Sequence, residues 1–499
     1  KSLQLGAPTL LRGSCSLKPN FIPLLTALFW VVHPVHVESV TYISGRADLL
    51  AGFFMLSALL MYIKHFYSIK FKRFLYLGSI FLFCLSLFSK EMGMILPLAL
   101  INYEYFFRKQ EKLSFRMKRL LPFLLIAIFY IFLRFTILNF ALASPLKKAI
   151  IFSPNNIIRI LSFLKGTVLY LGLLVMPINL HMERFMLPAK TILDPDVLLF
   201  IFLLIISLII LKNLKGEKRR FILFGMVCFF IFLFPQSNFM FIALMAEHYL
   251  YLPSIGIFLV AACGFNSLYN NRIIKKSLVS PIVIAILIFF GLLTFSQNYV
   301  WRNPLTFYRW EDRYARLSYI TRNNLANIYA FLGKDDLAIE KYEQALTISP
   351  NTVIIKKNIS IIEDNLIEKY KNVIKFQPEF AVNYYNLAYI YQRKGRVDEA
   401  ILYYKKAIEL RPYFAEAISN LGNVYERQGK FEQALIQYKQ AIAINPNFAQ
   451  AYFNIGVVLA EQGKLKEAQG YFEKALKINP DYRKARDYVE QIKEMLINN

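Results

Sequence analysis

FIPLLTALFWVV-HPVHVESVTYISGRAD-LLAGFFMLSALLMY, residues 21–62, is the stretch that decides the class of fold. Its first and last segments, residues 21–32 and 49–62, are apolar enough to lie in a bilayer. Between them lies a polar segment with ionisable side chains at His33, His36, Glu38, Arg46 and Asp48. Such groups at the mouth of two membrane helices are costly unless they face water or a polar cavity, so they are candidates for a functional site.

The alternative interpretation of this polar segment is a loop whose charges only mark the edge of the bilayer. Arg46 and Asp48 fit that interpretation well. Glu38 fits it less well, because two histidines, His33 and His36, precede it closely. We therefore favour the functional interpretation.

The composition of the whole chain also indicates a membrane protein. Of its 499 residues, 56% are hydrophobic and only 18% are charged, which is typical of a polytopic membrane protein with a soluble appendage. The net charge of +26 suggests nucleic-acid binding at first sight. Much of the basic excess, however, lies in short loops between apolar segments, where it sets membrane orientation and attracts anionic lipid headgroups.

Several classes of site are not indicated by the sequence. The four cysteines, Cys15, Cys84, Cys228 and Cys263, have neither disulfide nor zinc-site spacing, so we expect no disulfide framework and no zinc site. We also expect no other metal site and no bound cofactor. The sequence has no glycine-rich phosphate loop, no HExxH and no GxSxG motif, which removes the main support for an ATPase or a hydrolase.

Ten apolar segments are near the length that spans hydrocarbon as a helix. They cover residues 21–35, 47–63, 73–89, 92–107, 120–139, 157–176, 196–211, 220–236, 250–266 and 280–297. Basic residues in four short loops predict which loops are cytoplasmic. These loops are residues 64–73, 108–119, 212–220 and 272–276.

If all ten segments cross the membrane in turn, the basic loop 212–220 falls on the extracytoplasmic face, although its basic residues predict a cytoplasmic loop. The conflict disappears if residues 157–176 are re-entrant or interfacial, and this segment begins polar and ends at Pro177. We therefore predict nine crossings. The segment 33–48 then lies on the extracytoplasmic side together with Lys90 and Glu91, as does the C-terminal domain.

A period of 34 residues runs through the C-terminal part from about residue 319. It is marked by Gly395, Gly429 and Gly463, by Pro412, Pro446 and Pro480, and by Asn386, Asn420 and Asn454. Two helices per 34 residues, with glycine turning the chain between them and proline ending the second, is the tetratricopeptide repeat. We predict four good repeats and one degenerate copy around Asn358, which is six residues short and lacks the glycine turn.

The predicted fold is therefore all-α, a polytopic membrane helical domain followed by a tetratricopeptide-repeat α-solenoid. The membrane domain covers residues 1–300, and a connector covers residues 301–318. The repeats cover residues 319–483, and residues 484–499 form the capping helix that the exposed end of such an array requires.

One asparagine per repeat is a candidate for peptide binding on the concave surface of the array. An amide donates and accepts hydrogen bonds at once, which suits the backbone of an extended peptide whatever its sequence. The alternative is that these side chains are solvated or brace neighbouring repeats. The residues are Asn324, Asn386, Asn420 and Asn454.

Polar residues from several predicted extracytoplasmic loops form one set. A carboxylate near basic residues at a bilayer surface suits sugar transfer from a lipid phosphate, because the carboxylate takes the acceptor's proton and the cation holds the departing phosphate. For any one member, charge pairing that locks helices together is the alternative. The set comprises Glu38, Arg46, Asp48, Lys90, Glu91, Arg184, Asn238, Glu247 and His248.

Several motifs resemble one known family. His33-Pro-x-His36-x-Glu38-x-Val, followed by Gly45-Arg46-Ala-Asp48-Leu-Leu-Ala, is similar to the transmembrane and tetratricopeptide-repeat protein O-mannosyltransferases and their prokaryotic relatives. Lys90-Glu91-x-Gly93 and Trp301-Arg302-Asn303 fit the same family. The run AEHYLYLPS, residues 246–254, resembles its Ala-Glu-Arg-Tyr-Leu-Tyr-Leu-Pro-Ser, with His248 in place of the arginine.

This resemblance implies a C-type glycosyltransferase that moves mannose from a polyprenyl (dolichyl) phosphate to Ser or Thr of proteins offered by the repeats. The implied partners are the lipid-linked sugar, acceptor proteins and membrane lipids, without nucleic acid, and the repeats would lie in the periplasm or the endoplasmic reticulum lumen. We expect Glu38 to be catalytic and Arg46 and Lys90 to lie near the phosphate. The other expected substrate-binding residues are His33, His36, Asp48, Glu91, Asn238, Glu247, His248 and Tyr251.

One departure from the family concerns the N-terminal region. Family members begin with further membrane helices and an extracytoplasmic loop whose acidic residue serves as catalytic base, whereas residue 21 here already matches a later helix. We expect a truncated sequence or an inactive copy. The alternative function is therefore a non-catalytic, membrane-anchored repeat scaffold that binds proteins. A protonated histidine at position 248 can still contact phosphate.

Overall fold

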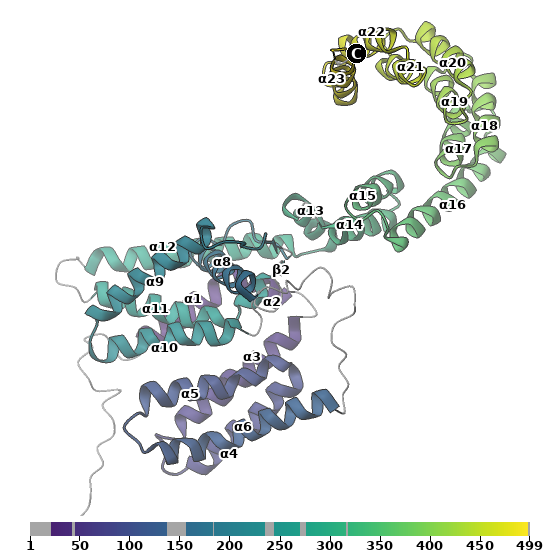
Figure 1. Cartoon of the computed structure of the whole chain (residues 1–499). Helices are drawn as coiled ribbons and strands as arrows, with labels where there is room; N and C mark the ends of the chain where they lie inside the picture. Colours follow the sequence, from purple (N-terminus) through teal and green to yellow (C-terminus); the bar gives the residue numbers. More distant parts are fainter. Residues whose placement is uncertain are drawn as a thin grey trace, which may run out of the picture. The chain divides into compact units, whose positions relative to one another are not determined.

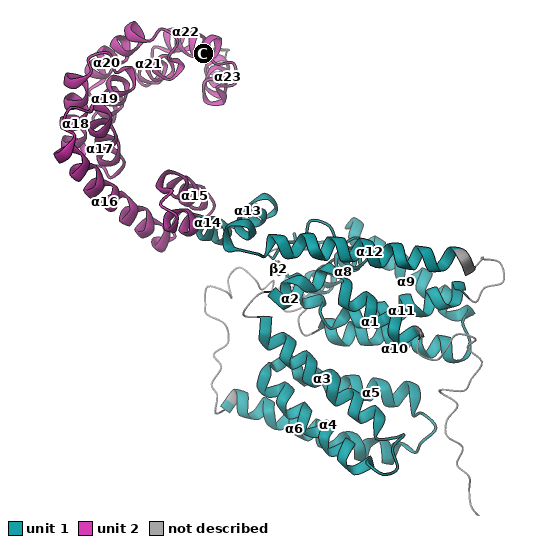
Figure 2. Cartoon of the chain, turned by 180° about the vertical axis from the view of Figure 1, so that it is seen from behind, with its two compact units in different colours: residues 1–325 teal, residues 326–499 magenta. Residues whose placement is uncertain are grey.

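Helices make up nearly all the regular structure of the described residues. The computed structural model describes residues 21–41, 45–136, 156–182, 184–234, 244–269, 276–315 and 318–497. The chain forms two units, residues 1–325 and residues 326–499 (Figure 2). The prediction of an all-α fold is confirmed, with one short antiparallel pair of two-residue strands besides the helices.

Unit 1 contains the apolar helices (Figure 1). In chain order its elements are α1 (Phe21–Val32), the 3₁₀ helix η2 (Pro34–His36), α2 (Val37–Thr41), α3 (Arg46–Lys64), α4 (Lys72–Ser89), the 3₁₀ helix η4 (Glu91–Ile95), α5 (Leu96–Phe107), α6 (Leu113–Thr136), α8 (Asn156–Val175), β1 (Arg184–Phe185), α9 (Pro195–Asn213), α10 (Gly216–Leu233), β2 (Leu244–Met245), the 3₁₀ helix η6 (Glu247–Leu250), α11 (Pro253–Tyr269), α12 (Lys276–Val300), α13 (Pro304–Tyr314) and α14 (Tyr319–Phe331).

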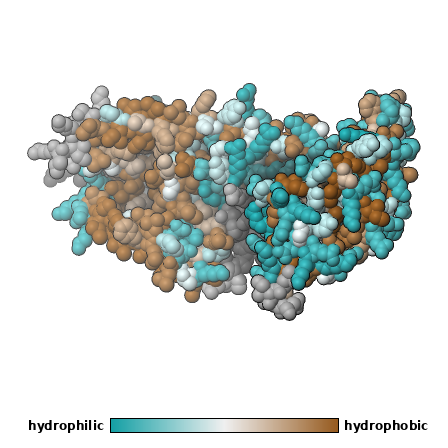
Figure 3. Space-filling model, turned by 90° about the horizontal axis from the view of Figure 1, so that it is seen from above, coloured by the Kyte–Doolittle hydropathy of each residue, from teal (hydrophilic) through white to brown (hydrophobic). Residues whose placement is uncertain are grey.

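Five helices among the described residues are long and apolar enough to cross a membrane. They are α3, α4, α8, α9 and the part of α12 from Leu278 to Val300, and a sixth span results if α1 and the following η2–α2 segment, bent by 56°, form one crossing. Large apolar side chains such as Phe53, Phe81 and Leu292 are exposed on these helices. Figure 3 shows hydrophobic side chains gathered over this part of the protein, and the chain is an integral membrane protein.

Residues 156–175 form one unbroken helix, α8, which is long and apolar enough to span. The re-entrant or interfacial placement of residues 157–176 stays a prediction. A bent pair of helices lies at α1 and the following η2–α2 segment. The number of crossings and the face on which each loop lies remain predictions.

Two apolar cores hold the helices of unit 1 together. One joins α3, α4, α5 and α6 around Met55, Phe83 and Phe123, and the other joins α1, α8, α10, α11 and α12 around Phe29 and Phe258. The helices α10 and α11 cross at a glycine pair, where a Cβ atom on Gly225 or Gly256 would meet the carbonyl oxygen of the other residue. These cores position the polar segments that connect the helices.

The boundary between the units falls within α14, so unit 2 begins at residue 326 and contains the rest of the repeats. Its helices are α15 (Asp335–Ile348), α16 (Val353–Phe376), α17 (Ala381–Arg393), α18 (Val397–Leu410), α19 (Ala415–Arg427), α20 (Phe431–Ile444), α21 (Ala449–Glu461), α22 (Leu465–Ile478) and α23 (Arg483–Ile497). The regular pairs are joined at glycines with φ of 71° (Gly395), 72° (Gly429) and 78° (Gly463), which L-residues with a Cβ rarely adopt.

The degenerate copy has a structure of its own. Residues 353–376 form the single helix α16, with no glycine turn to divide it into two. Because one helix stands where the other copies have a pair, α15, α16 and α17 meet without the pairwise stacking seen in the later repeats.

Candidate functional site

The polar segment between α1 and α3 is folded by its own histidine and proline. Extended backbone at His33 follows α1, and the His33 Nδ1 accepts a hydrogen bond from Val35 N (3.3 Å), with Pro34 opening η2. The His33 Nε2–H donates to the carbonyl oxygen of Leu174 on α8 (3.2 Å). Both ring nitrogens of His33 therefore bond the backbone, and the resulting bend turns α2 with Glu38 away from the axis of α1.

The carboxylate of Glu38 pairs with His248, which is distant in sequence and lies on η6. Glu38 Oε1 lies 2.6 Å from Nδ1 of His248, and Oε2 accepts from the His248 backbone N–H at 3.0 Å. An ionised carboxylate only accepts, so Nδ1 carries the shared proton. Glu38 is 3% exposed, whereas the His248 side chain is 24% exposed. Among the described residues, none bonds the other ring nitrogen, Nε2.

A second buried carboxylate, Glu247, lies beside this pair. Its Oε1 accepts hydrogen bonds from His181 N (2.8 Å) and from the Arg184 guanidinium (3.2 Å). Burial raises the pKa of the Glu247 carboxyl well above its ordinary value, the charge of Glu38 raises it further, and Arg184 opposes both. Burial together with the Arg184 charge lowers the pKa of His181 to about 4, against a hydrogen bond to the Asn179 carbonyl.

The loop that carries His181 and Arg184 is held from two sides. The strand β1 pairs with β2, with Arg184 opposite Met245. On the other side, α13 contributes Trp310, whose indole N–H donates to Leu180 O (2.7 Å), and Glu311, whose Oε1 accepts from the N–H of Met182 (2.7 Å). Sequence reasoning missed these two residues, although they follow closely on the Trp301-Arg302-Asn303 motif that it had singled out.

Lys90 and Asp48 form the second ion pair of the predicted set. Lys90 Nζ lies 2.6 and 2.7 Å from the two oxygens of Asp48 at the start of α3, and the Lys90 side chain is 31% exposed. Glu91, by contrast, faces Arg134 of α6 at 3.4 Å. Arg46 is exposed and forms no ion pair with another described residue. Lys90 is thus a half-exposed cation held in place by a buried carboxylate.

Two further predicted residues of this region, His36 and Tyr251, pack through their aromatic rings. His36 is buried, with its ring centroid 5.4 Å from that of Trp30 and 5.5 Å from that of Tyr251, and its Nε2 lies 3.4 Å from the Ser254 hydroxyl. The Trp30 indole N–H donates to the Tyr251 carbonyl oxygen (2.8 Å). The motif AEHYLYLPS is therefore packed directly against the segment that carries His33 and His36. Asn238 lies outside the described residues.

Each asparagine of the predicted peptide ladder has a hydrogen-bond partner on another helix. Asn324 donates to Tyr308 (3.0 Å), Asn420 to Tyr385 (3.1 Å) and Asn454 to Asn423 (2.7 Å), and Asn386 bonds Tyr370. These contacts join neighbouring helices, which is the bracing role weighed above. Peptide binding by the four amides remains a prediction.

A membrane helical bundle that contains buried carboxylate–cation pairs, in one chain with tetratricopeptide repeats, defines a class of membrane-anchored repeat proteins. Among the described residues, no group of three His, Cys, Asp or Glu side chains is arranged to hold a metal ion. Tetratricopeptide-repeat family models match residues 321–352, 369–401, 393–429, 427–463 and 449–482.

Several relatives that match about two thirds of this chain are named protein O-mannosyl-transferases. One from Caenorhabditis elegans is 28% identical, covering 66% of this chain and 46% of the relative. The Homo sapiens protein O-mannosyl-transferases TMTC4 and TMTC3 are 27% and 24% identical, covering 64% and 70% of this chain and 48% and 41% of the relatives. The chain thus spans about half the length of the curated relatives it matches.

These similarities confirm the resemblance to the transmembrane and tetratricopeptide-repeat protein O-mannosyltransferases that the motifs indicate. Among solved structures, the crystal structure of the MamA protein is 27% identical, covers 33% of this chain and 94% of that chain, and has a TM-score of 0.24.

Proposed function

We propose that this chain is part of a protein O-mannosyltransferase that moves mannose from a polyprenyl phosphate to Ser or Thr of proteins presented by its repeats. The similarity to named O-mannosyl-transferases supports the reaction class. The observation that carries the proposal is the pair formed by Glu38 and His248, because it leaves one imidazole nitrogen without a bond to any residue that the structure describes.

The transfer exchanges one carbon–oxygen bond for another. The acceptor oxygen attacks C1 of the sugar, the bond between C1 and the phosphate oxygen breaks, and polyprenyl phosphate leaves with the bonding electron pair. The acceptor hydroxyl gives its proton to a base, and a cation stabilises the negative charge that develops on the phosphate. The site therefore has to supply a proton acceptor and a cation.

His248 fits the part of the proton acceptor better than Glu38, to which we had given it from the sequence. Both oxygens of Glu38 accept hydrogen bonds from His248, and Glu38 is almost fully buried. With Nδ1–H donated to Glu38, the Nε2 lone pair of His248 takes the acceptor's proton, and the imidazolium that forms is stabilised by Glu38. Glu38 is then a positioning residue.

The ion pair of Lys90 and Asp48 fits the part of the phosphate cation. Asp48 fixes the ammonium group at 2.6 Å, while the lysine side chain remains 31% exposed. A cation held in place before the reaction stabilises developing charge without reorganisation. The exposed guanidinium of Arg46, two residues before Asp48, is a second cation for the same phosphate.

The test is mannose transfer in membranes that contain the full-length protein, from radiolabelled polyprenyl-phosphate mannose to endogenous protein. His248→Ala and His248→Arg should each lower transfer by about 10²–10⁴-fold, because neither residue accepts a proton near neutral pH. Glu38→Gln should lower it too and change the acidic limb of the pH–rate profile. Near-normal transfer by His248→Arg would restrict His248 to a phosphate contact.

The second candidate function is a non-catalytic scaffold that binds proteins through its repeats. It is favoured by the burial of Glu38 and Glu247, because buried ion pairs also lock helices together without taking part in chemistry. The same assay separates the two functions. Capture of client proteins with no transfer from the full-length protein, unchanged by His248→Ala, would establish the scaffold.

A further inference from the structure

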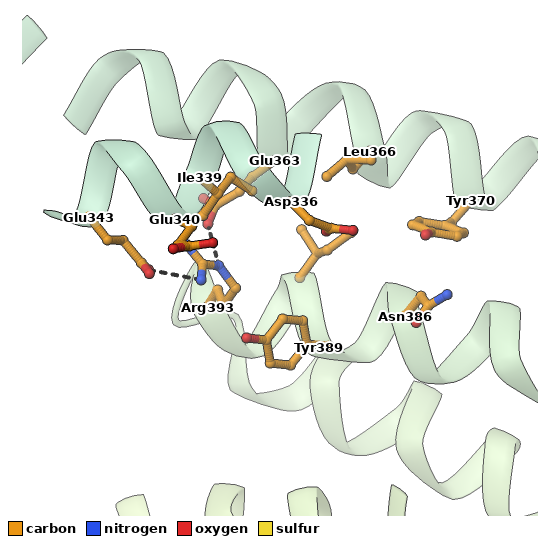
Figure 4. Close-up of a pocket in the computed structure, with 11 residues that line it drawn as sticks. Asp336, Ile339, Glu340, Glu343, Glu363, Leu366, Tyr370, Asn386, Tyr389 and Arg393 are labelled. Atoms are coloured by element: carbon orange, nitrogen blue, oxygen red, sulfur yellow. Dashed lines mark hydrogen bonds and ion pairs between the residues drawn. The ribbon is translucent and has the colours of Figure 1, made fainter. Parts of the chain in front are cut away.

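A pocket opens in unit 2 where the degenerate copy interrupts the regular repeats. Its volume is about 340 Å³, and its lining comes from three helices, α15, α16 and α17. This volume lies within the range of roughly 300–1,000 Å³ that small-ligand sites occupy. Figure 4 shows the side chains from these helices surrounding one hollow.

Acidic side chains outnumber basic ones in the lining of this pocket. Four carboxylates line it, Asp336, Glu340, Glu343 and Glu363, against one cation, Arg393. Arg393 bridges two of them, with its guanidinium 2.9 Å from Glu343 and 3.0 Å from Glu363 (Figure 4). The other two carboxylates, Asp336 and Glu340, are exposed and form no ion pair with any described cation.

The pocket also has an aromatic wall. Tyr389 is 45% exposed and lines the hollow from α17. The Arg393 guanidinium already lies 6.0 Å from the centre of its ring, a distance at which a cation is attracted to an aromatic face. Tyr370 and Asn386, bonded to each other, form the opposite end of the lining. The pocket already holds the guanidinium of Arg393. The carboxylates of Asp336 and Glu340 and the exposed ring of Tyr389 can therefore bind a second cation.

Of the three carboxylates that α15 contributes to the pocket, Glu340 is the one that α18, α20 and α22 do not repeat. When Ala338 of α15 is aligned with the equivalent alanine of α18, α20 and α22, the position of Glu340 holds Leu402, Ile436 and Gly470, and that of Glu343 holds Lys405, Lys439 and Glu473. None of these three later second helices repeats the carboxylate of Glu340, whereas acidic residues recur at the position of Asp336 (Asp398 and Glu432) and at that of Glu343 (Glu473). A negative pocket in a chain of net charge +26 is a local feature, not a consequence of composition.

We propose that this pocket binds a lysine or arginine side chain of a polypeptide that lies in the repeat array, with Asp336 and Glu340 pairing the cation and Tyr389 packing against it. A charge-assisted hydrogen bond to a carboxylate and contact with an aromatic face are the usual means of recognising such a side chain. The proposal rests on the proposed function in one respect: it names basic residues near the modified Ser or Thr as a feature of the acceptor.

The experiment uses the full chain in lipid nanodiscs without any donor lipid. Two fluorescent nonapeptides of Ser, Thr and Ala differ only at the centre, where one has arginine and the other its neutral isostere citrulline. Fluorescence anisotropy should give about tenfold tighter binding of the arginine peptide. The double variant Asp336→Asn/Glu340→Gln should remove that difference, and raising the salt concentration should reduce it in the unsubstituted protein.

The matched control is Asp398→Asn/Glu409→Gln on α18, where Asp398 aligns with Asp336 and both residues are exposed. It should leave the preference for arginine intact. Equal affinity for both peptides, or equal loss of preference in the control, would overturn the proposal. Binding is read without transfer, so an intact preference in a protein that transfers no mannose would reject the proposed function while leaving the pocket assignment standing.

Discussion

Two buried carboxylates of unit 1, Glu38 and Glu104, differ in what surrounds them. Glu104, on α5, has a fully buried side chain that accepts hydrogen bonds from Tyr62 (2.6 Å) and from two nitrogens of Arg119 (3.0 and 2.9 Å). Within the described part of the chain, the carboxylate of Glu38 is bonded by one residue, the partly exposed His248. The first carboxylate is enclosed by permanent donors, whereas the second depends on a titratable ring with an open nitrogen.

The surroundings of Glu38 and those of Glu104 lie near opposite ends of α3. Asp48, beside the Glu38 segment, and Tyr62, bonded to Glu104, are separated by 14 residues of this helix, or roughly 21 Å at 1.5 Å per residue. Around Glu104 the arginines also stack on Phe66, with Arg108 at 4.1 Å and Arg119 at 4.9 Å from the ring centre. A network in which every polar group is bonded, as around Glu104, holds the helices together. A pair such as Glu38 and His248 leaves a ring nitrogen that can take part in a reaction.

The largest effect on stability should come from Glu104→Gln. The change keeps the shape of the side chain but leaves the Arg119 guanidinium facing a neutral amide in a buried site, and breaking a buried ion pair costs about 3 kcal/mol or more. We expect a marked fall in folded yield and in the thermal midpoint of the purified protein in detergent.

Glu111→Gln is the matched control for that change. Glu111 also pairs with Arg119 (2.7 Å), but its side chain is 30% exposed, and pairs of that kind contribute at most about 1 kcal/mol. If both variants lose the same stability, the burial of Glu104 does not decide its role, and the contrast with Glu38 fails.

An intermediate effect should come from His181, which belongs to the Glu38 end. Its pKa in the folded protein is about 4, below the ordinary value of about 6.5. Between these values the unfolded chain binds a proton that the folded protein excludes, so stability falls as pH falls from 6.5 to 4, by at most about 3 kcal/mol. The raised pKa of Glu247 acts in the opposite sense, because its carboxyl loses stability as pH rises above its ordinary value.

The variant His181→Phe separates the contribution of the histidine to the pH dependence of stability from the contribution of Glu247. The phenyl ring can still stack on Tyr314, as the imidazole does at 5.6 Å, and the backbone N–H to Glu247 is unchanged. We expect its thermal midpoint to fall less than that of the unsubstituted protein between pH 6.5 and 4. Tyr314→Phe should keep the original slope. Parallel profiles for His181→Phe and the unsubstituted protein would contradict the assigned pKa.

The sequence predicted the regular parts of the fold because their causes are local. Glycines spaced 34 residues apart predict the turns between helices, and the structure has positive φ at Gly395, Gly429 and Gly463. The single helix α16 was not predicted, since a missing turn does not say whether one helix or none replaces the pair.

The candidate site was predicted as a set of residues but not as a set of pairs. Motif positions and loop charges brought Glu38, Glu247 and His248 together, but pairing across 210 residues depends on how the bundle packs. Glu104 was missed, although a lone carboxylate inside the apolar run 92–107, followed by a basic loop, is a signal that could have found it. His181 carried no signal, because nothing in its local sequence shows that it will be buried.

The smallest effect on stability should come from Glu38→Gln, the same substitution as at Glu104. A glutamine oxygen can accept from the backbone N–H of His248, and its NH₂ group can donate to Nδ1 if the ring changes tautomer. Both hydrogen bonds survive without any unpaired buried charge, so we expect a loss below about 1 kcal/mol. The thermal midpoint should stay within a few degrees while mannose transfer falls. A large loss of stability would instead make Glu38 a structural residue like Glu104, and the open nitrogen of His248 would then have no catalytic meaning.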